Sequence, residues 1–425
     1  MTVAVLFLLF AIFIILGLPL AFAMGLSAIV AIIAVDGQSF LIVPQRMVAS
    51  LDSFALLAVP LFILAGELMN SGGITGKIVS FSRAAIGHFR GGLAQANIMS
   101  NMFLAALSGS SLADLSAIGS MMIPAMTKEG YKKSYSVAVT SCAALMAPII
   151  PPSIIAVIYG SMTGVSIGAM FMGGAIPGII AGLGIMVLAR VMSERGGATA
   201  LPKESWSGFF EAALSALPAI VVPAIIVGGI LSGIFTPTEA GAVAVFYALS
   251  YGIITNRHSP RGIYTLLLAA GVTTASALLT LGGASLFSYV LVSSGFAQTV
   301  LDALVGLTEN GAVAILLIFF LLVVLGMFVE TVSALILVVP ILIPIVGYYD
   351  YHPVQFGIFT LMSLVLGGLT PPVGILAMVA CRIADVEYSK TFGMLAPFIL
   401  WWATATLIVA YIPFLTTWLP GLVLE

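Results

Sequence analysis

Two short stretches combine glycine or small hydroxyl-bearing residues in a way that could offer oxygen ligands to a cation. The first is Ser108-Gly109-Ser110-Ser111, and the second is Gly326-Met327-Phe328-Val329-Glu330-Thr331. Hydroxyls and free carbonyls at a non-helical turn suit Na⁺, which needs several oxygens at close range. Close helix packing is the alternative use of such small residues. We expect the ligand role, because a proline-rich break follows each stretch.

The proline-rich breaks are Ala147-Pro148-Ile149-Ile150-Pro151-Pro152-Ser153 and Gly367-Gly368-Leu369-Thr370-Pro371-Pro372. Consecutive prolines remove N–H donors, so the carbonyls upstream lose their helical partners. Such carbonyls suit Na⁺, and the N-terminus of the half-helix beyond the break favours an anionic group. A simple packing kink is the alternative, but kinks seldom occur twice at matched positions.

Four acidic residues lie within apolar surroundings: Glu67, Asp114, Glu239 and Glu330. Asp114 comes three residues after the first hydroxyl-bearing stretch, and Glu330 lies inside the second. An ionisable residue at membrane depth is a functional candidate by default, which favours these two. Glu67 and Glu239 could equally be helix-end residues with hydrated side chains.

The composition places these residues in a membrane. Of 425 residues, 61% are hydrophobic and 7% are charged, whereas soluble chains carry about 25% charged residues. The net charge of −2 offers no basic footprint for nucleic acid. The two cysteines, Cys142 and Cys381, lie in apolar runs and are expected to be small buried hydrophobes. We therefore expect an all-α polytopic protein in a lipid bilayer, with about a dozen hydrophobic elements.

The chain contains an internal repeat. A shift of 220 residues places Pro124 on Pro344, Pro151-Pro152 on Pro371-Pro372, and Pro177 on Pro397. We expect a first repeat at 1–190, a linker at 191–212 and a second repeat at 213–425. Each repeat holds two short arms and one interrupted helix. The arms span about 93–126 and about 311–346, and the interrupted helices span about 134–160 and about 354–381.

The arms are too short to cross a bilayer singly. Each has about 15 residues, or roughly 23 Å of helix, against a hydrocarbon core of about 30 Å. Each pair of arms is therefore expected to form a re-entrant hairpin that enters and leaves on the same side. The two hydroxyl-bearing stretches become the hairpin tips.

Loop charges predict that the repeats have opposite orientations. Loops 77–90 and 128–133 carry three Lys or Arg residues each, whereas their counterparts 297–310 and 348–353 carry none. Positively charged loops stay in the cytoplasm, so equivalent loops lie on opposite sides. The linker is then cytoplasmic and both termini face outward. Inverted repeats with broken helices are the architecture of secondary transporters.

We expect two Na⁺ sites, each formed by one tip and the break of the same repeat, with Asp114 tuning the first electrostatically. The predicted Na⁺ residues are Ser108, Gly109, Ser110, Ser111, Ala147, Pro148 and Ile150 in the first repeat, and Gly326, Glu330, Thr331, Ser333, Gly367, Leu369 and Thr370 in the second. The predicted substrate contacts are Ser110, Ser111, Asp114, Ser153, Thr331 and Pro372.

Three phrases resemble one known family across essentially the whole chain. Gly109-Ser110-Ser111-Leu112-Ala113-Asp114, Phe235-Thr236-Pro237-Thr238-Glu239-Ala240-Gly241-Ala242 and Gly368-Leu369-Thr370-Pro371-Pro372-Val373-Gly374 are similar to the large membrane subunit of TRAP (tripartite ATP-independent periplasmic) transporters. The resemblance implies Na⁺-driven import of an organic acid, commonly sialic acid or a C4-dicarboxylate, by an elevator motion. It also implies the bacterial inner membrane, a small four-helix membrane subunit and a periplasmic solute-binding protein.

Other classes find less support in the residues. His88, His258 and His352 fall in predicted loops, and the chain has no His-Glu-x-x-His motif for an intramembrane protease. Gly73-Ile74-Thr75-Gly76-Lys77 lacks the Ser or Thr and the spacing of a phosphate-binding loop. A single-component Na⁺-coupled anion transporter, a passive channel and a structural membrane subunit remain alternatives. The residues do not identify the substrate, because no Arg is placed inside the membrane as a carboxylate clamp.

Overall fold

The computed structural model describes residues 2–35, 37–197 and 202–423, and this part of the chain is helical without strands. The first-half helices are α1 (Thr2–Ile15), α2 (Leu20–Val30), α3 (Ile42–Leu51), α4 (Ala58–Ser71), α5 (Ile74–Ile86), α6 (Gly92–Ser108), α7 (Ser111–Lys128), α8 (Lys133–Ala143), α9 (Ile154–Thr163) and α10 (Ile167–Val191). The second-half helices are α11 (Trp206–Leu231), α12 (Pro237–Ile254), α13 (Pro260–Ser293), α14 (Phe296–Leu307), α15 (Gly311–Phe328), α16 (Thr331–Tyr348), α17 (Pro353–Gly367), α18 (Ile375–Ala384), α19 (Tyr388–Tyr411) and α20 (Phe414–Val423). Single turns of 3₁₀ helix at Phe54–Leu57 and Ala144–Met146 precede α4 and follow α8, and a π-helix at Ala31–Val35 extends α2.

The helices confirm a polytopic membrane protein. Within the described residues, seven helices are long and apolar enough to cross a bilayer. The longest is α13, with 34 residues. Many of their large apolar side chains face outward, such as Leu214 of α11 and Val272 of α13, which are 65% and 66% exposed. A lipid environment would cover these side chains, whereas water would not.

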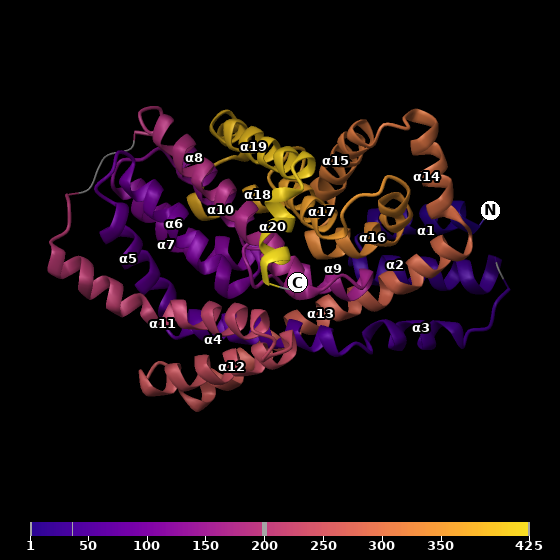
Figure 1. The fold of residues 1–425 in the computed structure, drawn as a ribbon, viewed down its shortest axis with the longest axis horizontal. Coiled ribbons are helices and arrows are strands. Elements are labelled where there is room, and N and C mark those ends of the chain that lie inside the picture. The colour runs from indigo at the N-terminus through magenta and orange to yellow at the C-terminus, as the bar shows by residue number, and fades with distance from the viewer. Residues whose placement is uncertain (1, 36, 198–201, 424–425) are drawn as a thin grey trace.

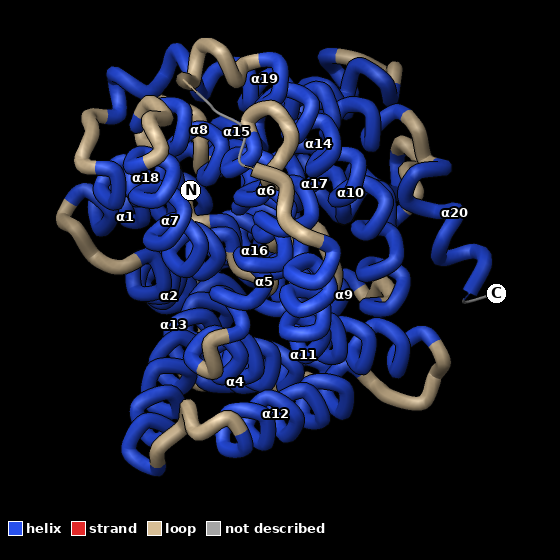
Figure 2. The backbone as a smooth tube through the Cα atoms, turned by 90° about the vertical axis from the view of Figure 1, so that its left-hand side faces the viewer, coloured by secondary structure: helices blue, strands red, loops and turns tan. Residues whose placement is uncertain are grey.

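The helices form two layers. In what we call the outer layer, α13 packs against α2, α3 and α4, while α12 packs against α4 and α11. Several of these helices run along the lower edge of the molecule in Figure 1 and lie at the bottom of Figure 2. The core layer holds α6–α10 and α15–α19, and α5 and α14 bridge the layers, because α5 contacts α6 and α11 while α14 contacts α13 and α16.

The order of helices in the core layer repeats. A shift of 220 residues carries the start of α8 at Lys133 onto the start of α17 at Pro353, and α7 onto α16. The repeat extends to tertiary hydrogen bonds. The Tyr135 hydroxyl donates to the Ala189 carbonyl at 2.6 Å, and the Gln355 amide, 220 positions later, donates to the Val409 carbonyl at 3.1 Å. Equivalent residues therefore tie equivalent helices together in both halves.

The arms and breaks lie where the sequence analysis places them. Helices α6 and α7 form the first pair of arms, and α15 and α16 form the second. The interrupted helices are α8 with α9 and α17 with α18, and both Pro151-Pro152 and Pro371-Pro372 contain a cis peptide bond. We call the α6–α7 and α15–α16 units hairpin 1 and hairpin 2, and the intervening segments break 1 and break 2.

Four expectations about loops and ends are wrong. The predicted loops 77–90 and 297–310 are mostly helix, as α5 and α14, because each is a short amphipathic segment that buries a mainly apolar face. The predicted linker 191–212 contains the first turns of α11, since Ser205 caps that helix by accepting the Gly208 N–H at 3.1 Å. The sequence also predicts one last helix over 393–417, but this segment divides into α19 and α20, with Pro413 between them.

Candidate functional site

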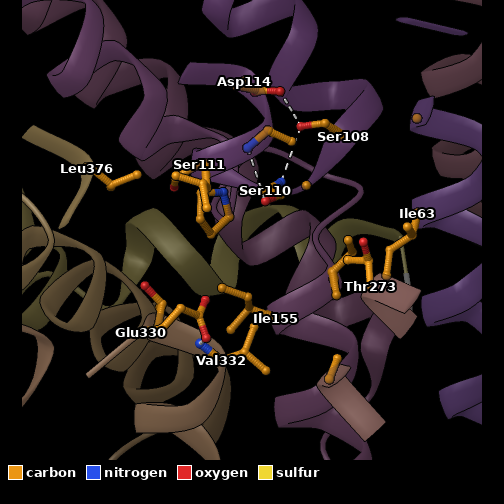
Figure 3. Close-up of a pocket in the computed structure, with 18 of the residues that line it drawn as sticks. Ile63, Ser108, Ser110, Ser111, Asp114, Ile155, Thr273, Glu330, Val332 and Leu376 are labelled. Atoms are coloured by element: carbon orange, nitrogen blue, oxygen red, sulfur yellow. Dashed lines mark hydrogen bonds between the residues drawn. The ribbon is translucent and has the colours of Figure 1, made fainter. Parts of the chain in front are cut away.

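A cavity of about 470 Å³ lies where both hairpin tips and both breaks meet the outer layer. Hairpin 1 lines it with residues from Leu104 to Ala117, and hairpin 2 lines it with Gly326 and Val329–Ser333. The breaks contribute Pro148 and Gly368, and the first turns of α9 and α18 contribute Ile154, Ile155, Ile375 and Leu376. Figure 3 shows the tip residues of both hairpins, with Ile63 of α4 and Thr273 of α13 close together to one side.

The tip of hairpin 1 is a tight turn pressed against break 1. Helix α6 ends at Ser108, Gly109 has a φ of +60°, and Ser110 caps α7 by accepting the Ala113 N–H at 3.5 Å. A Cβ atom on Gly109 would lie 3.0 Å from both the Ile154 nitrogen and the Pro152 oxygen. Glycine is therefore needed here both for its positive φ and for the close approach to break 1.

Two buried oxygens behind this tip lack partners. Asp114 is 0% exposed, and the Ser108 hydroxyl donates to one oxygen of its carboxylate. The other carboxylate oxygen has no hydrogen-bond partner, nor does the Ser111 hydroxyl, which is 8% exposed. A buried polar atom without a partner is costly. Since both residues line the cavity, both unpaired oxygens are available to a ligand.

The tip of hairpin 2 carries a carboxylate where hairpin 1 carries Ser110. Glu330 caps α16 by accepting the Val332 N–H at 3.0 Å and the Ser333 N–H at 3.3 Å. Gly326 lies inside α15 rather than in the turn, and a Cβ atom there would come 2.2 Å from the Leu364 oxygen of α17. Close packing of α15 on α17 therefore requires this glycine.

Several oxygens at the breaks already have partners. The Ser153 hydroxyl donates to the Pro148 carbonyl at 2.5 Å and accepts the Ala156 N–H at 3.1 Å, which caps α9. In break 2, the Thr370 hydroxyl donates to the Leu366 carbonyl at 2.9 Å, and the Tyr388 hydroxyl donates to the Leu369 carbonyl at 2.9 Å. A carbonyl has two lone pairs, so each can still accept a second contact.

The cavity includes ten of the residues predicted to bind Na⁺ or substrate: Ser108, Gly109, Ser110, Ser111, Asp114, Pro148, Gly326, Glu330, Thr331 and Ser333. Seven others do not line it: Ala147, Ile150, Ser153, Gly367, Leu369, Thr370 and Pro372. The structure therefore brings the two tips together at one cavity and leaves most of the predicted break residues out of its lining.

The outer layer lines the cavity with four polar residues absent from the predicted site and with Glu67, one of the four acids that the sequence places in apolar surroundings. Helix α13 presents Thr273, Ser276 and Thr280 to the cavity, and α4 presents Glu67 and Asn70. The spacing of the three hydroxyls is i, i+3 and i+7, which is one face of a helix and could have been noticed. Glu239 is different: it forms a capping box with Thr236 at the start of α12 and does not line the cavity. The helix-end interpretation therefore holds for Glu239.

The electrostatics of the cavity combine opposite tendencies. Helices α7, α9, α16 and α18 all begin at its wall, and a helix N-terminus carries a partial positive charge. Glu67, Asp114 and Glu330 supply carboxylates, while none of the described residues that line the cavity is Lys, Arg or His. Such a site can hold a small anion at helix ends and cations at carboxylate and hydroxyl oxygens.

Comparisons with known proteins identify relatives over nearly the whole chain. The family described as "Tripartite ATP-independent periplasmic transporter, DctM component" matches residues 7–415. The chain is 35% identical over 409 residues to the sialic acid TRAP transporter large permease protein SiaM of Vibrio cholerae, covering 96% of each chain. It is 33% identical over 449 residues to the C4-dicarboxylate TRAP transporter large permease protein DctM of the same organism, covering 100% of this chain and 98% of the other. Among solved structures, the fold is similar to the Alcanivorax borkumensis YdaH transporter, with a TM-score of 0.62, 14% identity, and coverage of 91% and 90%.

Proposed function

The chain belongs to the family of DctM components of tripartite ATP-independent periplasmic transporters, and on that basis we propose that it imports an organic acid anion driven by a Na⁺ gradient. Relatives named for sialic acid and for C4-dicarboxylates support these two substrate classes. Both are carboxylates, so the transported group is negatively charged at neutral pH.

The observation that carries this proposal is the meeting of four helix N-termini and three carboxylates in one cavity without a basic side chain. Helix N-termini favour the anion. The unpaired oxygens of Asp114 and Ser111 favour a cation beside it. An anion next to several carboxylates is repelled unless cations are bound at the same time. This arrangement supports the proposal that Na⁺ and substrate bind together.

We propose an elevator motion in which the core layer slides against the outer layer. The two repeats would lie in opposite orientations, which gives two related conformations, one open to each side. The contact between the layers at hairpin 1 supports sliding. A Cβ atom on Gly66 of α4 would lie 3.4 Å from the Ser108 Cα atom, so the helix surface there is smooth and close.

The proposed system has two further proteins, because the family description names a tripartite transporter. We propose a small four-helix membrane subunit and a periplasmic solute-binding protein that delivers the substrate. We also propose the bacterial inner membrane as the location, with both chain termini in the periplasm. The chain alone would then bind substrate poorly.

Uptake into proteoliposomes tests this proposal against its alternatives. The probes are radiolabelled N-acetylneuraminate and succinate, with an inward Na⁺ gradient. We expect accumulation of one probe with all three proteins present and little with this chain alone. Full concentrative uptake by the chain alone would favour a single-component transporter. Equilibration without accumulation would favour a passive channel.

A further inference from the structure

Glu67 is the one carboxylate in the cavity that the hairpins do not supply. It belongs to α4 of the outer layer, whereas Asp114 and Glu330 belong to hairpins of the core layer. The Asp114 carboxylate accepts a hydrogen bond from the Ser108 hydroxyl, and the Glu330 carboxylate accepts hydrogen bonds from two backbone N–H groups. The Glu67 side chain makes no hydrogen bond or ion pair with any residue that the structure describes.

Helix α4 places Glu67 at the wall of the cavity that also holds the hairpin 1 tip. Its neighbour Gly66 touches hairpin 1, since a Cβ atom there would lie 3.4 Å from both the Leu107 oxygen and the Ser108 Cα atom. Ile63, one turn earlier on the same face, lines the cavity beside Thr273 in Figure 3. Ser111 and Asp114 line the same cavity on the hairpin side, and each has a buried oxygen without a hydrogen-bond partner.

Glu67 also lies toward one end of the membrane path. It is four residues before the end of α4 at Ser71, which is about 6 Å of helix. The segment that follows carries Lys77, Arg83 and Arg90, which predicts the cytoplasmic side. The cavity therefore extends from the hairpin tips toward the predicted cytoplasmic end of α4.

We propose that Glu67 is a release residue that weakens binding of the anionic substrate only while the site faces the cytoplasm. This inference rests on the proposed function. The outer layer stays in place when the core layer moves. Glu67 therefore lies near the substrate while the site faces the cytoplasm and far from it while the site faces the periplasm. Its charge lowers affinity on the inside without lowering affinity on the outside, which favours net import.

The size of the effect follows from the size of the cavity. A volume of about 470 Å³ corresponds to a space roughly 10 Å across. At that separation, with an effective dielectric constant of about 20–40, repulsion between the Glu67 carboxylate and the substrate anion weakens affinity by about 4- to 15-fold. The hydroxyls of Thr273, Ser276 and Thr280 keep the same wall polar, so the departing anion stays hydrated. Neutral residues cannot supply the charge effect.

The test compares Glu67→Gln with wild type in proteoliposomes that contain the complete system, using N-acetylneuraminate and succinate as probes. The apparent affinity for the transported probe is measured separately at each face, by uptake and by efflux from preloaded vesicles. We expect Glu67→Gln to tighten the cytoplasmic-side affinity by about 4- to 15-fold and to leave the outside affinity within twofold. Glu67→Asp should retain the wild-type difference between the faces.

Glu211→Gln is the matched control, because Glu211 is an exposed acid on α11 that does not line the cavity. It should leave both affinities unchanged. An equal change at both faces, or no change at either, in a Glu67→Gln protein that still transports would overturn the inference and leave the proposed function intact. Absence of wild-type uptake of either probe under a Na⁺ gradient would overturn the proposed function and the inference with it.

Discussion

Ser111 and Asp114, predicted from their position at a hairpin tip, both line the cavity and both have a buried oxygen without a hydrogen-bond partner. Ser153 and Thr370 are predicted from their position at the proline-rich breaks, and their hydroxyls donate to the Pro148 and Leu366 carbonyls. Sequence alone does not distinguish a free hydroxyl from one that satisfies its own backbone, because both occur at helix breaks.

This difference gives a prediction for two single hydroxyl deletions. Ser111→Ala removes an oxygen that has no protein partner, so we expect the Na⁺ concentration for half-maximal uptake to rise by about tenfold, or about 1.4 kcal/mol. Thr370→Ala removes a hydroxyl that is bonded within its own helix, so we expect a change of less than about threefold. Uptake measured over a Na⁺ titration checks both variants. Equal changes in the half-maximal Na⁺ concentration would contradict the prediction that only the Ser111 hydroxyl contributes to Na⁺ binding.

At the scale of elements, glycine decides how closely the hairpins approach the interrupted helices. Gly326 of α15 and Gly367 of α17 face each other, and a Cβ atom on Gly367 would lie 2.2 Å from the Gly326 carbonyl carbon. Both positions were predicted as Na⁺ ligands, and their position in the fold shows a packing role that was not foreseen. A glycine that opens a turn and one that admits a neighbouring helix look alike in sequence.

Gly326→Ala should destabilise the protein by about 1–3 kcal/mol, because the added methyl group collides with rigid backbone. Gly347→Ala is the control. It lies in α16 with nothing within 4 Å of an added Cβ atom, so alanine there should be neutral or stabilising by up to about 1 kcal/mol. Thermal unfolding of both variants in detergent measures the difference. A neutral Gly326→Ala would show that α15 and α17 are not packed as described.

The bridging helices α5 and α14 show why some elements escaped prediction. Each is only 13 or 12 residues long, which is too short to span a bilayer. Each also contains charge, Lys77 and Arg83 in α5 and Asp302 in α14, and charge in a short segment predicts a loop. The polar face of the long apolar helix α13 is hard to recognise in the sequence. Its Thr273 and Thr280 hydroxyls donate to carbonyls one turn earlier, as threonines in ordinary helices do.

At the scale of the whole molecule, the repeat of core-layer helices was predictable because proline positions recur at a fixed shift of 220 residues. The meeting of both hairpin tips in one cavity was not, because contacts such as those between α7 and α18 and between α9 and α16 join the two halves. Periodicity within a chain indicates which elements are equivalent. It does not indicate how two copies interlock.

The orientation of the two halves gives a topological prediction. Lys132 and Asp350 lie in equivalent turns, after α7 and after α16. The positive-inside rule places Lys132 in the cytoplasm and Asp350 in the periplasm. We expect an impermeant thiol reagent added to intact cells to label Asp350→Cys and to spare Lys132→Cys. Cys142 and Cys381 are buried and should give little background. Labelling of both variants from the same side would exclude inverted repeats.

The measurement that tests the central claim most directly is concentrative uptake by the complete system under opposed ion gradients. The claim is that the cavity binds an organic anion together with Na⁺, because its three carboxylates exclude a bare anion. An inward Na⁺ gradient should drive accumulation of N-acetylneuraminate or succinate above the outside concentration. An equal K⁺ gradient, or dissipation of the Na⁺ gradient by an ionophore, should abolish that accumulation. Accumulation that proceeds equally well under the K⁺ gradient would contradict the account.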